Sequence, residues 1–395
     1  MNKTRNTQHA TRNTPIRPAS GLLVTCYLLL VTCLFFYSFT QVDLNLTLSK
    51  SSFWFGFQDF FQHLGYFQRP LSTAIYLIIT FLFFIFYFLF LWLVKKKKLS
   101  EKQLWFSVLM ATGILLFSYP AFSYDVFNYL FDARIFTKYQ LNPYHFKALD
   151  FPQDPWTRFM HWTHRTYPYG PSWLFFSIIL SFLGMGKFLA TLFLFKLISA
   201  LSYLGSVYLI GKILEKTEAK KKLLGMAFFA FNPLVIIETL VSAHQESLMI
   251  FLTLLFIYFL TKKKKLLSMI CYLLSIGIKY VTAPLLPLSF LGFKKKLALI
   301  LMTAVFLFVS INKELQPWYF LWVLPFVSLD LQKWSVTLST FFSLGIVLRY
   351  TPFLYYGHWN DPVPTIKFWV TAIPLILCFG SLFPTVIHRI VGRHR

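Results

Sequence analysis

The chain has 395 residues, of which 57% are apolar and 13% charged, and its mean hydropathy is +0.60. Soluble globular domains carry about 25% charged residues, so this composition excludes a set of water-soluble domains. The formal charge of +24 lies in short lysine runs between apolar stretches rather than on one basic face, which argues against a nucleic-acid-binding protein. We therefore expect an all-α polytopic membrane protein that lies in a lipid bilayer.

The first 20 residues are polar and rich in Thr, Asn and Arg, which predicts a disordered cytoplasmic tail over residues 1–20. The apolar run that begins at Gly21 is too long for a signal-peptide core and lacks a small-residue cleavage site, so we expect it to be retained as the first span. Residues 21–395 are expected to form a single transmembrane domain. The four cysteines all lie in apolar segments, so no disulfide framework is expected.

A helix needs about 20 apolar residues to cross a bilayer. Ten apolar runs are candidate spans: Gly21–Val42, Leu71–Val94, Leu104–Phe122, Phe188–Leu214, Leu223–Val241, Ser247–Leu260, Leu297–Asn312, Trp318–Leu331, Trp334–Leu348 and Phe368–His388. Ser172–Gly184 is shorter and is interpreted as re-entrant or interfacial. Leu266–Phe293, flanked by lysine runs, is interpreted as a hairpin of two short helices that meet near Lys279. The total expected is about ten to thirteen transmembrane helices.

The lysine runs predict the orientation of these spans, because cytoplasmic loops carry an excess of Lys and Arg. Placing Lys95–Lys98, Lys262–Lys265 and Lys294–Lys296 inside makes both termini cytoplasmic. The longest non-membrane segment, 123–171, and most carboxylates then lie on the outer side, where we expect the active site. If Leu266–Phe293 were a single span, every later loop would change sides.

The outer segment opens with a run that predicts a helix with an acidic face. Ser123 is a candidate N-cap, and Asp125, Asn128, Tyr129 and Asp132 share one face at helical spacing. No basic residue lies three or four positions from either aspartate, so no local ion pair explains them. Asp125 could serve the helix dipole or act as a general base, and both interpretations stay open.

Three other polar residues invite a functional interpretation. An isolated Lys279 between two apolar helices is either a functional cation or a lysine that snorkels to the interface. His161 and His164 have a spacing that metal ligands can show, but no third ligand accompanies them, so no required metal is predicted.

The run from Asp125 through Asn142-Pro143-Tyr144 resembles the first outer loop of GT-C glycosyltransferases, and in particular of the polyprenyl-phosphate-mannose-dependent mannosyltransferases. Four further motifs occur in the order seen in that family: Tyr167-Pro168-Tyr169-Gly170-Pro171, then Asn232-Pro233 with Glu238 and His244-Gln245-Glu246, then Gly277-Ile278-Lys279-Tyr280, then Gln316-Pro317-Trp318-Tyr319. The family usually has an Asp where this chain has Glu246, a departure that keeps the charge.

The resemblance implies a GT-C-like helical bundle. It implies transfer of a hexose, mannose above all, with inversion, from a polyprenyl-phosphate donor to an extracytoplasmic glycan or lipid acceptor, without a cofactor. Asp125 would deprotonate the acceptor hydroxyl, and Asp132 would orient the acceptor. Lys279 and His244 would meet the donor phosphate; Arg134 could join them only if its helix bends, and Arg349 is a second cation of the outer side.

The remaining residues implied to contact substrate are Tyr129, Glu246, Tyr280, Gln316 and Trp318. Each motif also has a structural interpretation. His244 could be a buried structural histidine, Tyr167–Pro171 a rigid turn, and Gln316–Tyr319 an interfacial anchor.

Two other functions remain as alternatives. A transporter or flippase of lipid-linked sugars would show internal repeats and charges at the bilayer midplane in matching halves. No clear repeat is seen, and the carboxylates concentrate in one outer loop, which favours an enzyme. The second alternative is a scaffold subunit that has lost activity.

Overall fold

The computed structural model describes residues 18–391, with side chains over residues 21–380. Among these residues the chain is almost wholly helical and contains no β-strand, which confirms the expected all-α class. Residues 1–17 of the expected N-terminal tail lie outside the described residues. The first helix begins at Pro18.

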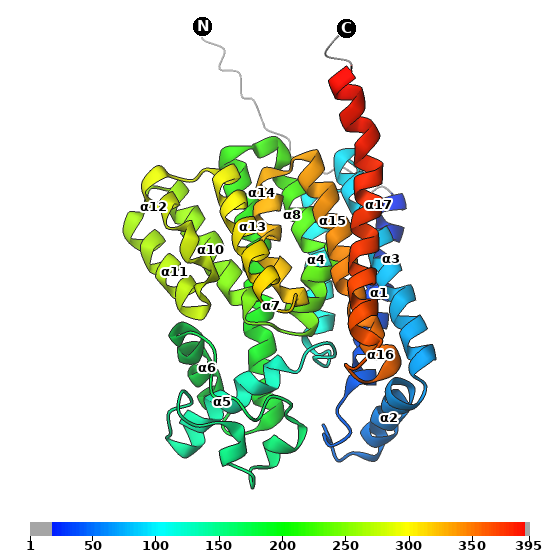
Figure 1. Ribbon diagram of the computed structural model, residues 1–395, viewed down its shortest axis with the longest axis vertical. Helices are drawn as coiled ribbons and strands as arrows, with labels where there is room; N and C mark the ends of the chain where they lie inside the picture. Colours follow the sequence, from blue (N-terminus) through cyan, green and yellow to red (C-terminus); the bar gives the residue numbers. More distant parts are fainter. Residues whose placement is uncertain (1–17, 392–395) are drawn as a thin grey trace, which may run out of the picture.

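A group of helices forms the N-terminal part, followed by the segment that was predicted to lie outside the membrane and then by another long helix (Figure 1). The elements are α1 Pro18–Ser38, η1 Phe39–Gln41, α2 Ser52–Gln62, η2 His63–Phe67, α3 Arg69–Lys95, α4 Glu101–Leu116, α5 Asp125–Tyr139, η3 Ala148–Asp150, η4 Pro155–Phe159, α6 Pro171–Leu183 and α7 Phe188–Thr217.

The second half is built from shorter and more often interrupted helices. They are η5 Ala219–Lys221, α8 Lys222–Ala230, α9 Pro233–Val235, η6 Ile236–Val241, α10 Glu246–Thr261, α11 Lys265–Ile278, η7 Tyr280–Leu285, α12 Pro287–Leu291, α13 Lys295–Asn312, η8 Pro317–Trp322, α14 Leu324–Asp330, α15 Lys333–Leu348, α16 Thr351–Tyr356 and α17 Val363–Val391.

Each predicted span coincides with a helix or with a run of short helices, and the protein is a polytopic membrane protein. Within the described residues, five helices are long and apolar enough to cross a membrane: Gly21–Gln41, Arg69–Lys95, Phe188–Thr217, Lys295–Asn312 and Val363–Gly380. The expected ten to thirteen is approached only when shorter and broken helices are counted. The predicted span Leu104–Phe122 is an example, because its helix ends at Leu116, shortly before Tyr119-Pro120.

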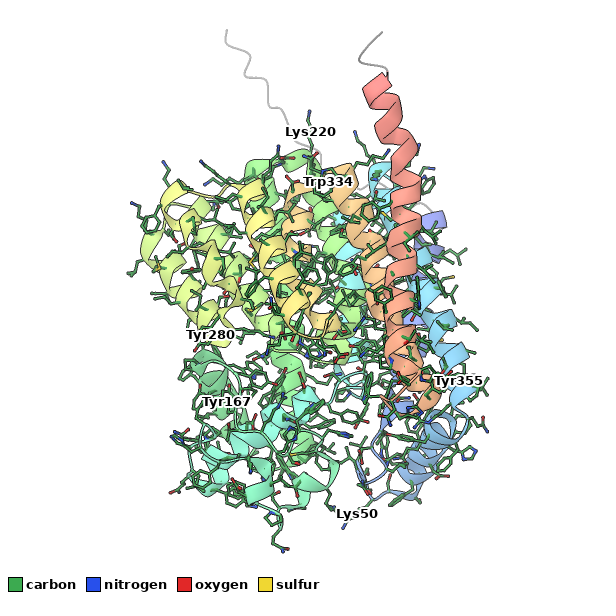
Figure 2. The ribbon with its side chains drawn as sticks, viewed as in Figure 1. Lys50, Tyr167, Lys220, Tyr280, Trp334 and Tyr355 are labelled. Atoms are coloured by element: carbon green, nitrogen blue, oxygen red, sulfur yellow. The ribbon has the colours of Figure 1, made fainter. Side chains whose placement is uncertain are left out.

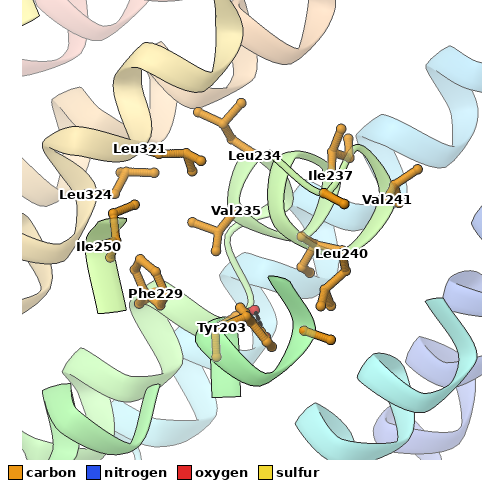
Figure 3. Close-up of a cluster of buried hydrophobic side chains, with 14 of the residues drawn as sticks. Tyr203, Phe229, Leu234, Val235, Ile237, Leu240, Val241, Ile250, Leu321 and Leu324 are labelled. Atoms are coloured by element: carbon orange, nitrogen blue, oxygen red, sulfur yellow. Dashed lines mark hydrogen bonds between the residues drawn. The ribbon is translucent and has the colours of Figure 1, made fainter. Parts of the chain in front are cut away.

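The span expected over Leu223–Val241 is broken at Asn232-Pro233, where its two parts meet at 52°. The Asn232 side chain caps the second part by accepting a hydrogen bond from the Leu234 N–H at 3.0 Å. The Ala230 carbonyl, freed by the break, accepts a hydrogen bond from the Tyr203 O–H of α7 at 2.7 Å. Apolar side chains from η6, α7, α10 and α14 pack around this bend (Figure 3), so a buried helix break leaves these backbone groups satisfied.

A second break separates α11 from η7. Lys279 is extended between the two helices, at φ −153° and ψ 128°, where the sequence predicted that two short helices would meet. Gly170, the N-cap of α6, lies against this break, and its N–H donates to the Ile278 carbonyl at 3.2 Å. A Cβ on Gly170 would lie 2.2 Å from the Gly277 carbonyl oxygen, so the two backbones approach as closely as only glycine permits.

Acidic and basic side chains pair at one end of the molecule. Lys220 lies at one end, with Trp334, and Lys50 lies at the opposite end (Figure 2). Acidic residues of the first end pair with its lysines: Lys222 lies 3.0 Å from Glu101, and Lys221 lies 2.7 Å from Glu218. Glu101 and Glu218 therefore lie among the lysines of this end.

A buried lysine joins two of the connecting segments. Lys196, on α7 and 3% exposed, donates hydrogen bonds to the Ser118 carbonyl at 2.6 Å, the Ser118 hydroxyl at 2.7 Å and the Val241 carbonyl at 3.3 Å. The first segment leads into α5 and the second into α10. The Lys196 amino group thus satisfies backbone carbonyls of both segments.

Candidate functional site

The site is built around the first turn of α5, where Asp125 is the first residue. The predicted N-cap was wrong by one residue: Tyr124 occupies that position, and the Ser123 hydroxyl accepts a hydrogen bond from the Asp125 N–H at 3.2 Å. Asp125 is 9% exposed, so its carboxylate is buried at a helix N-terminus, where the helix dipole favours the ionised form.

The predicted acidic face of α5 is present and buried. Asn128, Tyr129 and Asp132 are each at most 5% exposed. The Tyr129 ring packs edge-on against Tyr169, which precedes α6, and against Trp173 of α6, with ring centroids 5.1 and 5.2 Å apart. This packing fixes the direction of the face, so Asp125 and Asp132 are held toward the same interior.

Asp125 has two cationic neighbours that are distant in sequence. A guanidinium nitrogen of Arg165 lies 3.8 Å from Oδ1, and His244 Nδ1 lies 3.9 Å from Oδ2. Burial raises the pKa of Asp125, while His244 and Arg165 oppose this rise. Arg165 was not predicted, because the search for partners at helical spacing reaches only four residues along the chain.

Asp132 lies in a more apolar environment than Asp125. Burial raises its pKa to about 8, with Arg165 opposing the rise and the negative charge of Asp125 adding to it. At neutral pH Asp132 is therefore largely a neutral carboxylic acid that can donate a hydrogen bond, whereas an ionised carboxylate can only accept. The two aspartates of one face thus differ in proton affinity.

His244 is positioned by an irregular backbone. It follows η6, a π-helix, and Ala243, whose φ of 55° is uncommon for a residue with a side chain. Its Nε2 lies 3.2 Å from Glu238 Oε2, and its ring stacks on Trp318 with centroids 4.2 Å apart. Glu238 is in turn bound by Tyr350, whose O–H donates at 2.7 Å.

The charge of His244 follows from these neighbours. Burial disfavours the imidazolium, but the contact with Glu238 and the charge of Asp125 outweigh this effect, so the pKa of His244 is raised. Neither ring nitrogen has a hydrogen bond of regular geometry to another described residue, although His244 is 1% exposed. Its Nδ1 therefore remains able to donate toward the Asp125 side.

Lys279 is turned toward the interior rather than snorkelling outward. Its Nζ donates to Glu246 Oε1 at 2.6 Å, and it lies 5.1 Å from the ring centroids of both Tyr319 and Trp322. Glu246 is 1% exposed, so this ion pair is buried on its acidic side. Glu246, which stands where the family usually has an Asp, thus neutralises Lys279, the residue predicted to bind the donor phosphate.

Two predicted site residues lie elsewhere. Arg134 projects from another side of α5, where its Nε lies 2.8 Å from Asp154 Oδ2 and its guanidinium stacks 4.0 Å over the Trp156 ring. The helix does not bend to bring it to Asp125. Tyr280 is 69% exposed, although it is adjacent to Lys279 in sequence.

A cavity of about 590 Å³ opens beside Asp125. Its walls come from the α4–α5 connection, from residues 315–318 at the start of η8, and from the segment that joins α15 to α17. Asp125, Gln316, Trp318 and Arg349 line it, so four of the predicted residues share one cavity. The described residues contain no group of three or more His, Cys, Asp and Glu arranged to hold a metal ion.

These features define an all-α, multi-pass membrane protein with a buried acid, nearby cations and an adjoining cavity. Residues 47–293, more than half of the chain, match the family model described as "Alpha-(1->6)-mannopyranosyltransferase, N-terminal domain". The chain belongs to this family of GT-C-type mannosyltransferases and is accordingly a hexosyltransferase. The comparisons with curated proteins and with solved structures gave no match.

The matched segment includes most of the cluster just described. Asp125, Arg165, His244 and Lys279 lie within residues 47–293, whereas Arg349 lies beyond them, as do Gln316 and Trp318. The family membership therefore covers the acid and its nearest cations. The far wall of the cavity is defined by the structure alone.

Proposed function

We propose that this mannosyltransferase takes its hexose from a polyprenyl-phosphate sugar and transfers it, with inversion, to a hydroxyl of an extracytoplasmic glycan or glycolipid, with Asp125 as general base. The observation that carries the proposal is the position of Asp125, a buried carboxylate on the wall of a 590 Å³ cavity with cationic side chains on both sides of it. A general base must reach the acceptor hydroxyl while the leaving group meets positive charge.

In the proposed reaction the acceptor oxygen forms a bond to the anomeric carbon as the bond from that carbon to the phosphate oxygen breaks. The hydroxyl proton passes to Asp125, and the bonding electron pair leaves with the phosphate. Asp132, largely protonated at neutral pH, donates a hydrogen bond that orients the acceptor. His244, whose pKa is raised by its acidic neighbours, stabilises the ionised form of Asp125.

The remaining predicted residues take supporting roles. Lys279 is neutralised by Glu246, so the pair more reasonably holds the α11–η7 break in place than binds an anion. Trp318 presents one face to His244 and borders the cavity, where an aromatic ring can pack against a sugar. Arg134, bound to Asp154, is not part of the proposed site.

We place the cavity on the extracytoplasmic side and both termini in the cytoplasm. This placement is supported by the lysine-rich loops at the end of the molecule opposite to Lys50 (Figure 2). α5 and α6 lie toward that opposite end, away from the described end of α17 (Figure 1). The donor sugar would then be presented in the outer leaflet.

The experiment that tests this function uses purified full-length protein with labelled polyprenyl-phosphate hexoses. Asp125→Asn keeps the size of the side chain but cannot accept a proton, so transfer should fall by about 10²–10⁴-fold. Asp132→Asn retains hydrogen-bond donors and should have the milder effect. If Asp125→Asn transfers sugar at the wild-type rate and Asp132→Asn is inactive, then Asp132 is the general base and Asp125 orients the acceptor.

The runner-up, a flippase of lipid-linked sugars, makes the opposite prediction. Such a protein would move labelled lipid across a vesicle membrane without forming a glycosidic bond. Reconstituted wild-type protein that moves the donor but releases neither transferred nor hydrolysed sugar would favour it.

A further inference from the structure

Two basic side chains of the cavity share one counter-ion. Lys367 forms an ion pair with Glu314 and lies 4.6 Å over the Trp359 ring. A guanidinium nitrogen of Arg349 lies 3.8 Å from the same Glu314 oxygen. The side chains of Arg349 and Lys367 are 10% and 13% exposed, whereas that of Glu314 is 61% exposed.

Arg349 is oriented by neutral groups rather than by a second acid. One of its terminal nitrogens donates to the Thr371 hydroxyl at 3.2 Å and the Lys367 carbonyl at 3.4 Å, and the other donates to the Leu315 carbonyl at 2.9 Å. Its Nε is buried and has no hydrogen-bond partner among the described residues. The guanidinium is thus fixed in direction, and among the described residues Glu314 is its ion-pair partner.

Two other predicted cations are paired with more deeply buried acids. Lys279 is paired with Glu246, whose side chain is 1% exposed, and Arg134 with Asp154, whose side chain is 0% exposed. Withdrawing either acid would leave a buried charge unpaired, which is costly. Glu314 is itself largely exposed, so its carboxylate can turn into solvent once another anion takes over its pairing with the two buried cations.

The charge of the cavity agrees with an anionic ligand. Among the described residues that line the cavity, Asp125 is the one acid. The basic residues of the lining are Arg349, Lys367 and two histidines. Asp125, Arg349 and Lys367 thus line the same cavity. An inverting displacement requires this arrangement, because the attacking hydroxyl and the departing phosphate lie on opposite faces of the sugar.

We propose that Arg349 and Lys367 form the subsite for the phosphate of the lipid-linked donor, and that Glu314 serves as their counter-ion until the donor binds. This proposal rests on the proposed function and assigns the phosphate to the far wall of the cavity instead of to Lys279. Donor binding exchanges one anion for another, so the two cations are never left uncompensated.

The surroundings of Lys367 also suit a lipid. It lies in α17, and the two residues that follow it, Phe368 and Trp369, are 62% and 51% exposed. The apolar span Val363–Gly380 is only 22% buried, so most of its surface is available to hydrocarbon. A prenyl chain attached to a phosphate at Lys367 can therefore lie along α17.

The test measures binding without turnover. Farnesyl phosphate, which carries no sugar, is titrated into purified full-length protein in detergent by equilibrium dialysis of the labelled compound. Glu314→Gln should bind it roughly two- to fivefold more tightly, because the competing anion is lost. Lys367→Gln and Arg349→Gln should each bind at least about tenfold more weakly. Lys279→Met is the matched control and should keep the wild-type affinity.

Two further ligands distinguish the source of the phosphate. Inorganic phosphate that binds as tightly as farnesyl phosphate would indicate a site for the free anion and overturn the lipid assignment. Farnesol, which lacks the anion, should bind alike to the wild type and to Lys367→Gln. If Lys367→Gln keeps the wild-type affinity and Lys279→Met loses it, the phosphate binds at Lys279 and the proposal is wrong.

Failure of this subsite is separable from failure of the proposed function. Wild-type binding by all three variants, with transfer still abolished in Asp125→Asn, would reject the subsite and keep the transferase. The predicted affinity changes in a protein that transfers no sugar would keep the subsite and reject the reaction. Thermal unfolding of each variant establishes that weaker binding does not reflect a misfolded protein.

Discussion

At the scale of single residues, the chemistry of the site depends on neighbours that are far apart in sequence. Asp125 meets Arg165 and His244, and His244 meets Glu238. Each contact sets a proton affinity in a buried place, where charges interact more strongly than in water. The proton affinities of the site therefore belong to the cluster rather than to any one side chain.

Glu238 provides a test of this coupling through His244. Glu238→Gln keeps an acceptor for the Tyr350 O–H but removes the charge that raises the pKa of His244. The imidazolium should then be lost at lower pH, so the alkaline limb of the pH–rate profile for transfer should move to lower pH. Three acids raise the pKa of His244, namely Glu238, Asp125 and Glu246. The variant changes only Glu238.

The same substitution should alter stability in a pH-dependent way. A raised folded-state pKa contributes stability that is complete below the unfolded value of 6.5 and is lost as pH rises through the folded value. In Glu238→Gln this contribution should shrink, with the largest loss in Tm at acidic pH. Equal destabilisation at every pH, with an unmoved rate profile, would make Glu238 a packing residue only. Glu238→Asp should restore part of the profile.

At the scale of elements, interrupted helices bring the functional groups together. The break at Asn232-Pro233 and the π-helix η6 lead to His244, and the break between α11 and η7 holds Lys279. Helix interruptions at membrane depth are tolerated where protein covers them, and they are frequent at functional sites. A regular span would direct these side chains along a straight row instead.

The contact between Gly170 and Gly277 should couple the outer segment to the Lys279 break. Gly170→Ala places a methyl group 2.2 Å from the Gly277 carbonyl oxygen, so one backbone must move, at a cost of roughly 1–3 kcal/mol. We expect a lower Tm and reduced transfer. Gly113→Ala is the control, since a Cβ there meets nothing within 4 Å and alanine favours the helix. Equal behaviour of the two variants would show that the contact is unimportant.

At the scale of the whole molecule, the distribution of lysines predicts the topology. A cysteine in place of Lys147, in a protein whose native cysteines are replaced, should react with an impermeant maleimide in intact cells. A cysteine at Lys220, which lies at the lysine-rich end, should react only after permeabilisation (Figure 2). The reverse pattern would invert the proposed orientation and place the cavity in the cytoplasm.

The fold was largely predictable from the sequence because span length and lysine runs are local signals. The hairpin at Lys279, the acidic face of α5 and the turn at Gly170-Pro171 were all predicted in place. The partners of these groups were not, since ion pairs such as Lys279 with Glu246 join residues 33 positions apart. Arg165 lies in a loop without periodicity, and no sequence pattern singled it out. The sequence singled out Asn232-Pro233 as a motif, but the bend there was not expected.

The hydrogen bonds of Lys196 have a consequence for how the site opens. One side-chain amino group is hydrogen-bonded to both the segment before α5 and the segment before His244, so neither can detach without leaving a buried donor unsatisfied. The two segments should therefore unfold locally as one cooperative unit. Their amide hydrogens would exchange with solvent at a common rate, and the enzyme would lose both halves of its acid–base machinery in a single event.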